Sequence, residues 1–167
     1  MNDTYKRIRA GGRVRRWHTI PVINEETVAH HSWGVATVLL ALWPDCSREL
    51  LVAALYHDVH ESVTGDIPKP AFWRNPNLAD VVDDIEEDVQ RELGITPALT
   101  DKEKEQLAIA DMFDLCFRCE EEILLGNKSF EDILRAASAW LWGVKLEGAA
   151  EKMRSSIRNW MKERGIL

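Results

Sequence analysis

The sequence lacks several features that define common classes of protein. Its three cysteines, Cys46, Cys116 and Cys119, are too few and too irregularly spaced for a disulfide framework, which indicates a reducing compartment. No segment approaches the roughly 18–20 consecutive apolar residues of a membrane span, and no apolar run follows the basic opening as in a secretory signal. Alternating apolar and polar residues, typical of strands, are almost absent. We therefore expect a cytoplasmic protein without membrane contact.

An excess of positive charge is also missing. The 167 residues include 28 Asp and Glu against 21 Lys and Arg, a net charge of −7. Proteins that coat nucleic acid draw most of their affinity from basic side chains on phosphates, so we expect no stable nucleic-acid binding. The charge is unevenly distributed, because residues 1–23 carry a net charge of +5 and residues 80–122 a net charge of −11. The basic N-terminal segment still suits a small anionic substrate.

Apolar residues at helical spacing run through almost the whole chain. After an irregular opening, this spacing and the capping residues predict helices over about 24–43, 47–61, 75–93, 100–126 and 145–164, with another that starts at Ser129. Thr100 and Glu103 form a capping box, while Gly94 and Gly165 mark helix ends. We expect an all-α fold of six or seven helices in one domain over residues 1–167, which includes the C-terminal helices 129–164.

Four residues with metal-binding side chains stand in apolar or small-residue surroundings. His31 lies in VAHHSWGVA, His57 and Asp58 lie in AALYHDVHE, and Asp111 lies in LAIADMFDL. A carboxylate is costly to bury unless it is paired or binds a metal, and imidazole with carboxylate suits a divalent ion. A single buried histidine is more often a hydrogen-bonded core residue, and a lone His-Asp pair means little. The combination on three predicted helices favours a metal site.

The same segments carry a family resemblance. Arg16-Trp17, ETVAHHSWGVA, YHDVHESVTGDIPKP and ADMFD follow one another in an order and spacing that resemble the HD-domain metal-dependent phosphohydrolases. Within that group the chain is similar to the YfbR-type 5′-deoxynucleotidases and to their phage relatives, the dATP triphosphohydrolases. The similarity covers residues 13–127, so that the motifs end before the last predicted helices.

The resemblance implies an HD-domain helical bundle with one divalent metal ion per subunit, either Zn, Co, Mn or Mg. The implied metal ligands are His31, His57, Asp58 and Asp111. His31 is preferred to His30 because the family ligand directly precedes Ser or Thr, here Ser32.

The resemblance also assigns catalytic and substrate-binding residues. Glu61 matches the family acid/base, and it lies four residues after His57, so that both side chains share a helix face. Asp66 matches a carboxylate near the reaction centre. The implied substrate contacts are Arg16 and Lys69 for phosphate, and Trp17 with Ile20 as an apolar slot for a purine. Two lysines common in the family are replaced by Phe72 and Ala108. The candidate substitutes are Lys69, Arg74, Lys104 and the basic residues Arg13, Arg15 and Arg16.

The resulting prediction is a phosphohydrolase that converts dATP to deoxyadenosine and triphosphate and depletes the dATP pool. The alternative is a 5′-deoxynucleoside monophosphatase, followed by an enzyme of cyclic or guanosine signalling nucleotides. A non-catalytic nucleotide-binding module is a distant alternative, because the catalytic set is intact. The resemblance further implies a homo-oligomer, either a dimer or a hexamer, in the host cytoplasm if a phage encodes it. Trp140, Trp142 and Trp160 are candidates for core or subunit contacts, and we interpret the Cys116-x-x-Cys119 pair as ordinary helix residues.

Overall fold

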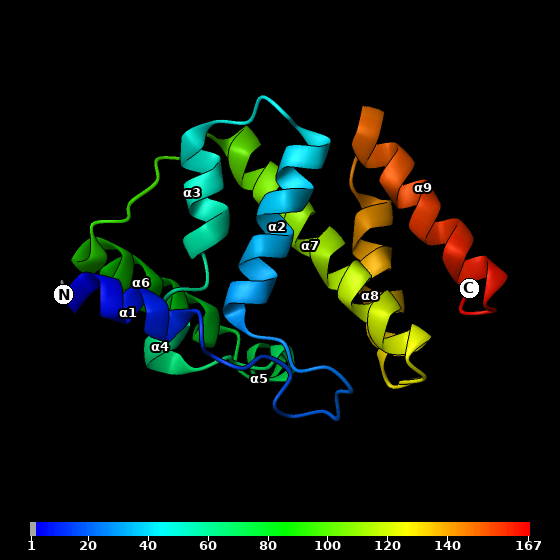
Figure 1. Cartoon of the computed structure of the whole chain (residues 1–167), viewed down its shortest axis with the longest axis horizontal. Coiled ribbons are helices and arrows are strands. Elements are labelled where there is room, and N and C mark those ends of the chain that lie inside the picture. The colour runs from blue at the N-terminus through cyan, green and yellow to red at the C-terminus, as the bar shows by residue number, and fades with distance from the viewer. Residues whose placement is uncertain (1–2) are drawn as a thin grey trace.

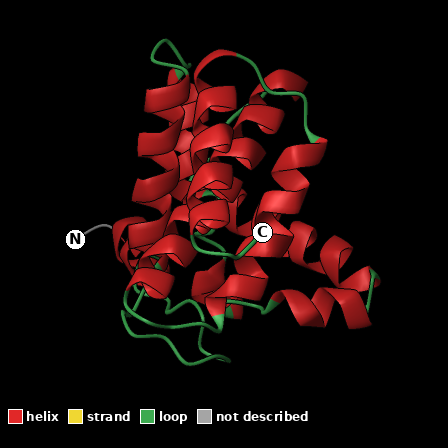
Figure 2. Ribbon diagram, turned by 90° about the vertical axis from the view of Figure 1, so that its right-hand side faces the viewer, coloured by secondary structure: helices red, strands yellow, loops and turns green. Residues whose placement is uncertain are grey.

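Helices form every regular element in the computed structural model, which describes residues 3–167 (Figures 1 and 2). In chain order they are α1 (Asp3–Gly11), α2 (Val28–Leu42), α3 (Arg48–Tyr56), α4 (Glu61–Thr64), α5 (Lys69–Arg74), α6 (Asn77–Leu93), α7 (Asp101–Leu124), α8 (Phe130–Gly143) and α9 (Gly148–Glu163). Within the described residues the only β-type pairing is an isolated bridge between Arg15 and Thr27. The predicted all-α fold is confirmed.

Three short helices in the structure are additional to the helices whose ranges the sequence predicts. The segment 3–11, expected to be irregular, forms α1, and the loop rich in proline contains α4 and α5. Proline is accepted in the first turn of a helix, and Pro70 occupies that position in α5. Local propensity in these segments is weak, so their helical form depends on packing.

The first predicted helix begins later than expected. Its N-cap is Thr27 and not Asn24. The backbone N–H of Asn24 donates to Glu122, and its carbonyl accepts from Arg118. These contacts with α7 hold Asn24 outside the helix, which shows that tertiary contacts override a good capping residue.

Other helix ends are set by the residues that the sequence indicates. Thr100 and Glu103 form a reciprocal capping box at the start of α7, and the Ser47 hydroxyl accepts from the Leu50 backbone N–H at the start of α3. Gly94 ends α6 with φ 67°, a left-handed conformation that glycine adopts without steric cost. The register of α7 determines where Asp111 lies, so this cap contributes directly to the site.

Two apolar clusters connect the helices. The larger one lies among α2, α3, α7, α8 and α9, and includes Leu39, Phe113, Leu134 and Met161, all fully buried. The smaller one contains Val59, Val89, Leu93 and Ile95, and lies where α1, α4 and α6 gather in Figure 1. Helix α3 contacts both clusters, and the turn 57–60 that follows it contributes Val59 to the smaller one. That turn carries His57 and Asp58.

No helix within residues 3–167 is both long enough and apolar enough to cross a bilayer.

Candidate metal centre and active site

The four predicted metal ligands come from three helical segments that pack against one another. His31 lies in the first turn of α2, His57 and Asp58 lie in the turn after α3, and Asp111 lies in the middle of α7. Helix α2 packs against both α3 and α7, which brings the three segments together (Figure 1). We call these four residues the metal-ligand cluster.

Ligand atoms of His31, His57 and Asp58 lie close to one another, and Asp111 lies beside His31. The Nε2 atoms of His31 and His57 are 3.2 Å apart. Asp58 Oδ2 lies 3.6 Å from the first of these nitrogens and 3.4 Å from the second. Asp111 Oδ1 lies 3.0 Å from His31 Nε2. His31, His57 and Asp58 therefore have the mutual distances of a metal site, and Asp111 adds a fourth ligand atom beside them.

The other nitrogen of each imidazole is already engaged. His31 Nδ1 lies 2.7 Å from Asp114 Oδ2, and His57 Nδ1 lies 3.0 Å from the Ala54 carbonyl oxygen. Both partners are acceptors, so each Nδ1 carries the hydrogen and each Nε2 can offer its lone pair. Metal-binding histidines show this arrangement, in which a partner fixes the tautomer and the ring orientation. The residues present therefore fit a divalent ion.

The carboxylates of the metal-ligand cluster also favour a positive charge beside them. Burial lowers the pKa of His31, but hydrogen bonds from its ring to Asp111 and Asp114 outweigh this effect and raise the pKa to about 9. Burial raises the pKa values of Asp58 and Asp111, yet the neighbouring cationic groups bring both below their usual range. A bound divalent ion would replace the imidazolium proton in balancing these carboxylates.

Residues 12–27, which we call the arm, carry Arg16 to the edge of the metal-ligand cluster. Arg16 Nη1 lies 2.8 Å from Asp58 Oδ2, and its Nε lies 3.2 Å from Glu26 Oε2. The arm closes on itself because the Arg16 N–H donates to the Glu26 carbonyl. The guanidinium is thus placed beside a ligand carboxylate, where an anionic substrate group would approach the ion.

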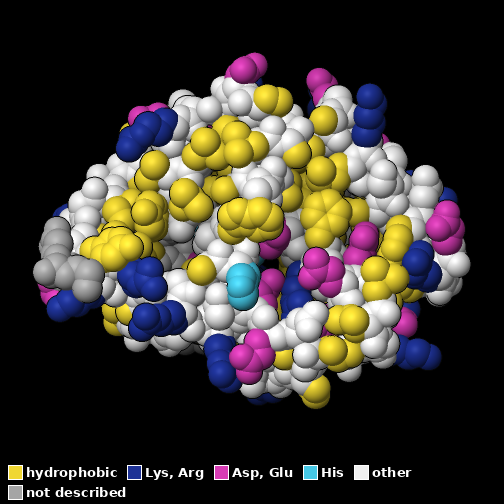
Figure 3. Space-filling model, viewed as in Figure 1, with side chains coloured by type: hydrophobic (Ala, Val, Ile, Leu, Met, Phe, Trp, Pro, Cys, Tyr) yellow, Lys and Arg dark blue, Asp and Glu magenta, His cyan; other side chains and the backbone are white. Residues whose placement is uncertain are grey.

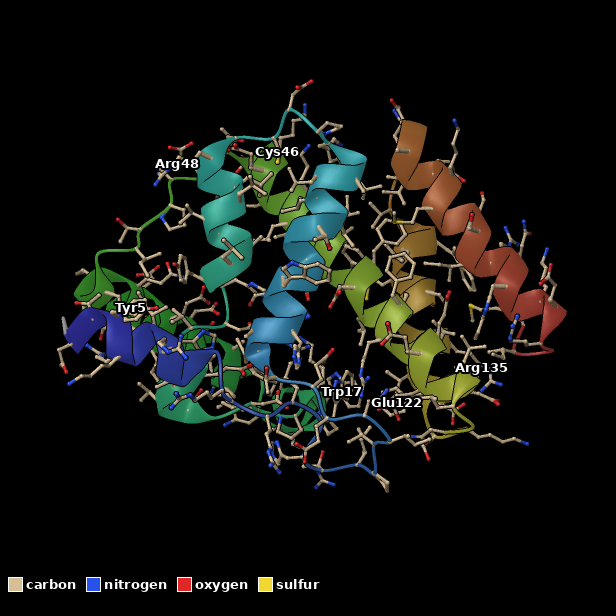
Figure 4. All side chains as sticks on the ribbon, viewed as in Figure 1. Tyr5, Trp17, Cys46, Arg48, Glu122 and Arg135 are labelled. Carbon is tan, nitrogen blue, oxygen red and sulfur yellow. The ribbon has the colours of Figure 1, made fainter. Side chains whose placement is uncertain are left out.

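Trp17 adopts a conformation that is unusual for a residue with a side chain. Its φ is 65°, in a region that costs about 1–3 kcal/mol for a non-glycine residue. Its backbone N–H donates to Asp66 Oδ2 at 3.0 Å, its indole Nε1 donates to Glu26 Oε2 at 2.7 Å, and its ring packs against Phe130 with centroids 5.2 Å apart. Figure 4 shows Trp17 on the arm near the C-terminal part of α7. Asp66 therefore holds the arm, while its role near the reaction centre stays a prediction.

Glu61 is buried beside the metal-ligand cluster at the start of α4. Its Oε2 has no hydrogen-bond partner among the described residues. Burial, with the negative charges of Asp58 and Asp66, raises the pKa of Glu61 to about 8. A carboxyl group whose pKa lies near neutrality can both give and accept a proton in this environment.

Ile20 and Lys69 complete the set of predicted substrate contacts. Ile20 is partly buried and packs against the larger apolar cluster. Lys69 is exposed at the first position of α5, where its Nζ lies 5.4 Å from the centre of the Phe72 ring. Ala108 is exposed on α7, and His30 is exposed on α2, on the outer side from His31. The structure therefore brings Arg16 to the ligands, but it leaves Lys69 at the surface.

Two acidic residues of the site were missed in the sequence. Asp114 binds His31, and Glu26 accepts from both Arg16 and Trp17. Asp114 follows Asp111 by three residues, a spacing that places both on one helix face, so the signal was present in ADMFD. Glu26 lies in the arm, where no periodicity indicates which way a side chain points.

Cys116 and Cys119 are structural residues of α7. Both are fully buried in the larger apolar cluster. Burial raises the pKa of the Cys116 thiol to about 12 and that of Cys119 still further. The interpretation of the C-x-x-C pair as ordinary helix residues is consistent with this environment, because a thiol metal ligand must be deprotonated.

The sequence as a whole matches a known family. The sequence profile described as 5′-deoxynucleotidase YfbR-like matches residues 5–154, which is most of the chain. The chain belongs to the YfbR-like 5′-deoxynucleotidase family. The predicted family is thereby confirmed, and with it the assignment of the chain as a hydrolase.

Individual members of the YfbR-like family align over most of their length. The 5′-deoxynucleotidase YfbR of Photorhabdus temperata is 30% identical over 141 residues, which cover 70% of this chain and 72% of that protein. The 5′-deoxynucleotidase YfbR of Escherichia coli is 28% identical over 174 aligned residues, which cover 90% of this chain and 83% of that protein.

Solved structures share the fold. The HD phosphohydrolase DatZ of cyanophage S-2L, bound to dA and one catalytic Zn²⁺ ion, superimposes with a TM-score of 0.66 at 20% identity and covers 98% of both chains. The PH0347 protein of Pyrococcus horikoshii gives a TM-score of 0.72 at 24% identity, covering 94% of this chain and 98% of that one. At these identities the likeness supports the HD-domain fold.

Proposed function

We propose that this protein hydrolyses the 5′-phosphate ester of deoxynucleotides at one divalent metal ion. The observation that carries this proposal is the convergence of two imidazole Nε2 atoms and an Asp58 oxygen, with an Asp111 oxygen 3.0 Å from His31 Nε2 and both Nδ1 atoms held by acceptors. The ligands would be His31, His57, Asp58 and Asp111. Two nitrogen and two oxygen ligands suit zinc, and the related DatZ structure contains one catalytic Zn²⁺ ion.

The bound ion would supply Lewis acidity to a phosphoryl oxygen and lower the pKa of a coordinated water. The protein supplies the remaining charge through Arg16, whose guanidinium lies at the edge of the ligand set and can bind two phosphate oxygens. Glu26 fixes that side chain from behind. Substrate phosphate would therefore lie between Arg16 and the ion, with its charge neutralised from both sides.

Glu61 is suited to protonate the 5′ oxygen as the phosphate ester bond breaks. Its raised pKa of about 8 keeps a proton on the carboxyl group at neutral pH in the metal-free protein. A bound ion lowers this value, because it offsets the charge of Asp58. Asp66 lies close enough to affect this pKa and at the same time holds the Trp17 backbone, so it links the arm to the proton carrier.

A monophosphate is the substrate class that the site supports best. Arg16 is the basic side chain that contacts the metal-ligand cluster, and a deoxynucleoside monophosphate carries about two negative charges, against about four on a triphosphate. Lysines common in the family are replaced by Phe72 and Ala108, while Lys69 is exposed. The 5′-deoxynucleotidase names of the curated relatives point the same way.

Hydrolysis of dATP to deoxyadenosine and triphosphate is the second candidate. DatZ, bound to dA in its structure, matches this chain over nearly its whole length. In addition, Lys104 lines a cavity of about 150 Å³ that also reaches His57 and Tyr56. A cation in a cavity that reaches the ligand His57 would suit a longer phosphate chain.

One experiment separates the two candidates. Purified protein with Zn²⁺, Co²⁺ or Mn²⁺ is incubated with dNMPs, dNTPs and the matching ribonucleotides, and the products are separated by ion-exchange chromatography. Orthophosphate from dNMPs supports the first candidate, and intact triphosphate from dATP supports the second. Failure to hydrolyse any deoxynucleotide with any of these metals would contradict both, and Asp58→Asn provides the inactive control.

We also propose that the protein forms a homo-oligomer. Hydrophobic side chains gather on the face over α2 and α3 (Figure 3), and Trp33 on α2 is 68% exposed. Of the C-terminal tryptophans, Trp140 is exposed, whereas Trp142 and Trp160 pack against the larger apolar cluster. Sedimentation velocity would test this proposal, and a monomer at micromolar concentration would contradict it.

A further inference from the structure

Asp114 stands behind one of the two imidazoles of the metal-ligand cluster. Its Oδ2 lies 2.7 Å from His31 Nδ1, and the His31 side chain is only 2% exposed. Asp114 follows Asp111 by one turn of α7, so this helix provides both a metal ligand and the partner of another ligand. His57, in contrast, donates from Nδ1 to a neutral backbone carbonyl, that of Ala54.

Gly34 provides the space that the Asp114 carboxylate occupies. A Cβ atom at position 34 would overlap Asp114 Oδ1 and would lie 2.7 Å from Asp114 Cγ, closer than real Cβ contacts allow. Gly34 lies in the interior of α2, one turn after His31, where glycine is less favourable than alanine. The helix therefore contains glycine at a place where a side chain would displace the partner of His31.

We propose that Asp114 is a positioning residue for His31 and that Gly34 admits its carboxylate, an inference that rests on the metal site of the proposed function. The hydrogen bond from Nδ1 fixes the tautomer that turns the Nε2 lone pair to the ion. A carboxylate partner also raises the basicity of that lone pair more than a carbonyl does. Asp114 thus strengthens the bond of one ligand without contacting the ion or the substrate.

A purely structural role for Asp114 makes a different prediction. If the carboxylate only satisfied a buried Nδ1–H, its loss would lower the thermal midpoint and leave metal affinity in the folded protein unchanged. As a positioning residue, Asp114 must affect metal affinity itself. Removal of such a partner typically weakens metal affinity about 10–100-fold.

The test measures Zn²⁺ dissociation constants of the metal-free protein by competition with a chelating dye. Asp114→Ala is expected to weaken binding about 10–100-fold. Asp114→Asn keeps a neutral acceptor near His31 and should lose less, about threefold to tenfold, which lies between the wild type and the alanine variant. The absorption spectrum of the Co²⁺-substituted protein should change in both variants, because it reports the ligand field directly.

Gly34→Ala provides the second arm of the test. Alone, it should weaken Zn²⁺ binding by a factor similar to that of Asp114→Ala, because the new methyl group displaces the carboxylate. Combined with Asp114→Ala, it should cause no further loss and should raise the thermal midpoint above that of Asp114→Ala, since the overlap no longer exists. This non-additivity is specific to two residues that act through one contact.

The outcomes separate the inference from the function on which it rests. If the wild type binds none of Zn²⁺, Co²⁺ and Mn²⁺, the proposed metal site is wrong and the role of Asp114 falls with it. If the wild type binds metal and Asp114→Asn, Gly34→Ala and every folded Asp114→Ala sample bind it equally tightly, the positioning role is overturned while the metal site stands. Unchanged Co²⁺ spectra in the variants would have the same meaning.

Discussion

Two groups of charged side chains involve residues of α7, and they differ in which donors surround their carboxylates. In the metal-ligand cluster, imidazole nitrogens and carboxylate oxygens lie 3.0–3.6 Å apart, and their charges are balanced by the proton on His31 and by Arg16. Near the C-terminal end of α7, the fully buried Glu122 carboxylate is surrounded by donors. These are the Ile23 and Asn24 N–H groups, the Arg118 guanidinium and the Asn127 amide, at 2.7–2.9 Å. We call this second group the Glu122 cluster.

The difference indicates which group is structural and which is functional. Burial alone would raise the pKa of Glu122, but the hydrogen bonds that it accepts hold the pKa below its usual value. Its charge is thus satisfied by the chain itself, and it anchors the arm to α7 (Figure 4). The metal-ligand cluster instead depends on a proton held by His31, which a divalent ion would replace. The Glu122 cluster therefore stabilises the arm, and we propose that the metal-ligand cluster provides the chemistry.

The strongest test of this comparison removes one metal ligand. His31→Ala should abolish metal binding and lower turnover by about 10⁴-fold or more, since the Lewis acid and the activated water are lost together. His30→Ala is a matched control, because the adjacent residue is exposed on the same helix and should retain wild-type turnover. Metal content by plasma mass spectrometry and initial rates decide the result. Equal metal content in the two variants would contradict the assignment of His31.

Substitution of Glu61 tests whether its carboxyl group supplies the proton for the 5′ oxygen. Glu61→Gln should lower turnover by about 10²–10⁴-fold while metal stays bound. The same change should stabilise the metal-free protein at high pH. The pKa of Glu61 rises from 4.5 in the unfolded chain to about 8 in the fold, so its ionisation costs stability progressively between these pH values and fully above the upper one.

The stability gain of Glu61→Gln should therefore be near zero below pH 4.5 and reach a few kcal/mol at most above pH 8. Urea unfolding in the presence of EDTA at pH 4.5 and pH 8.5 measures it. A gain that is the same at both pH values, together with full activity, would show that Glu61 is an ordinary surface acid.

The Glu122 cluster should respond in stability and leave the chemistry intact. Glu122→Ala leaves Arg118 buried without its closest carboxylate, which should cost about 3–5 kcal/mol in the free energy of unfolding. Glu121→Ala is the control, because that side chain is 66% exposed and its removal should change stability by less than about 0.5 kcal/mol. Denaturant unfolding gives both values. A loss of zinc affinity in folded Glu122→Ala would contradict the proposal that the Glu122 cluster affects stability alone.

Arg16 should show the smallest of these effects. Arg16→Lys keeps the positive charge but loses the planar fork, so KM should rise about tenfold, equivalent to one hydrogen bond to a charged group at about 1.5 kcal/mol. Arg15→Lys is the control, because the Arg15 side chain is 70% exposed and pairs with Glu25 at the surface. Steady-state kinetics on the preferred substrate compare the two. Equal KM values would exclude the guanidinium fork from phosphate binding.

The sequence predicted the parts of the molecule that depend on local pattern. Helical spacing and end signals such as Gly94 and the Thr100 capping box located the helices, and the apolar surroundings of His31 and Asp111 marked them as unusual. These signals depend on residues that are neighbours in the sequence, so they can be recognised without knowledge of the fold.

What the sequence did not predict depends on contacts between distant segments. Asp114 gains its role only because α2 presents Gly34 and His31 to that face of α7. Asn24 fails as a helix cap because Glu122, 98 residues away, binds its N–H. Trp17 reaches a positive φ only because Asp66 and Glu26 hold it there. Such contacts follow from packing, which periodicity alone does not specify.

The most direct test of the central claim is X-ray absorption at the zinc edge, with one equivalent of Zn²⁺ added to the metal-free protein. Convergence of His31, His57, Asp58 and Asp111 predicts nitrogen and oxygen ligands at about 2.0–2.2 Å, with the outer-shell scattering of two imidazoles. The same signal should lose one imidazole in His57→Ala. Sulfur scattering at about 2.3 Å, or a shell without imidazole, would contradict the claim.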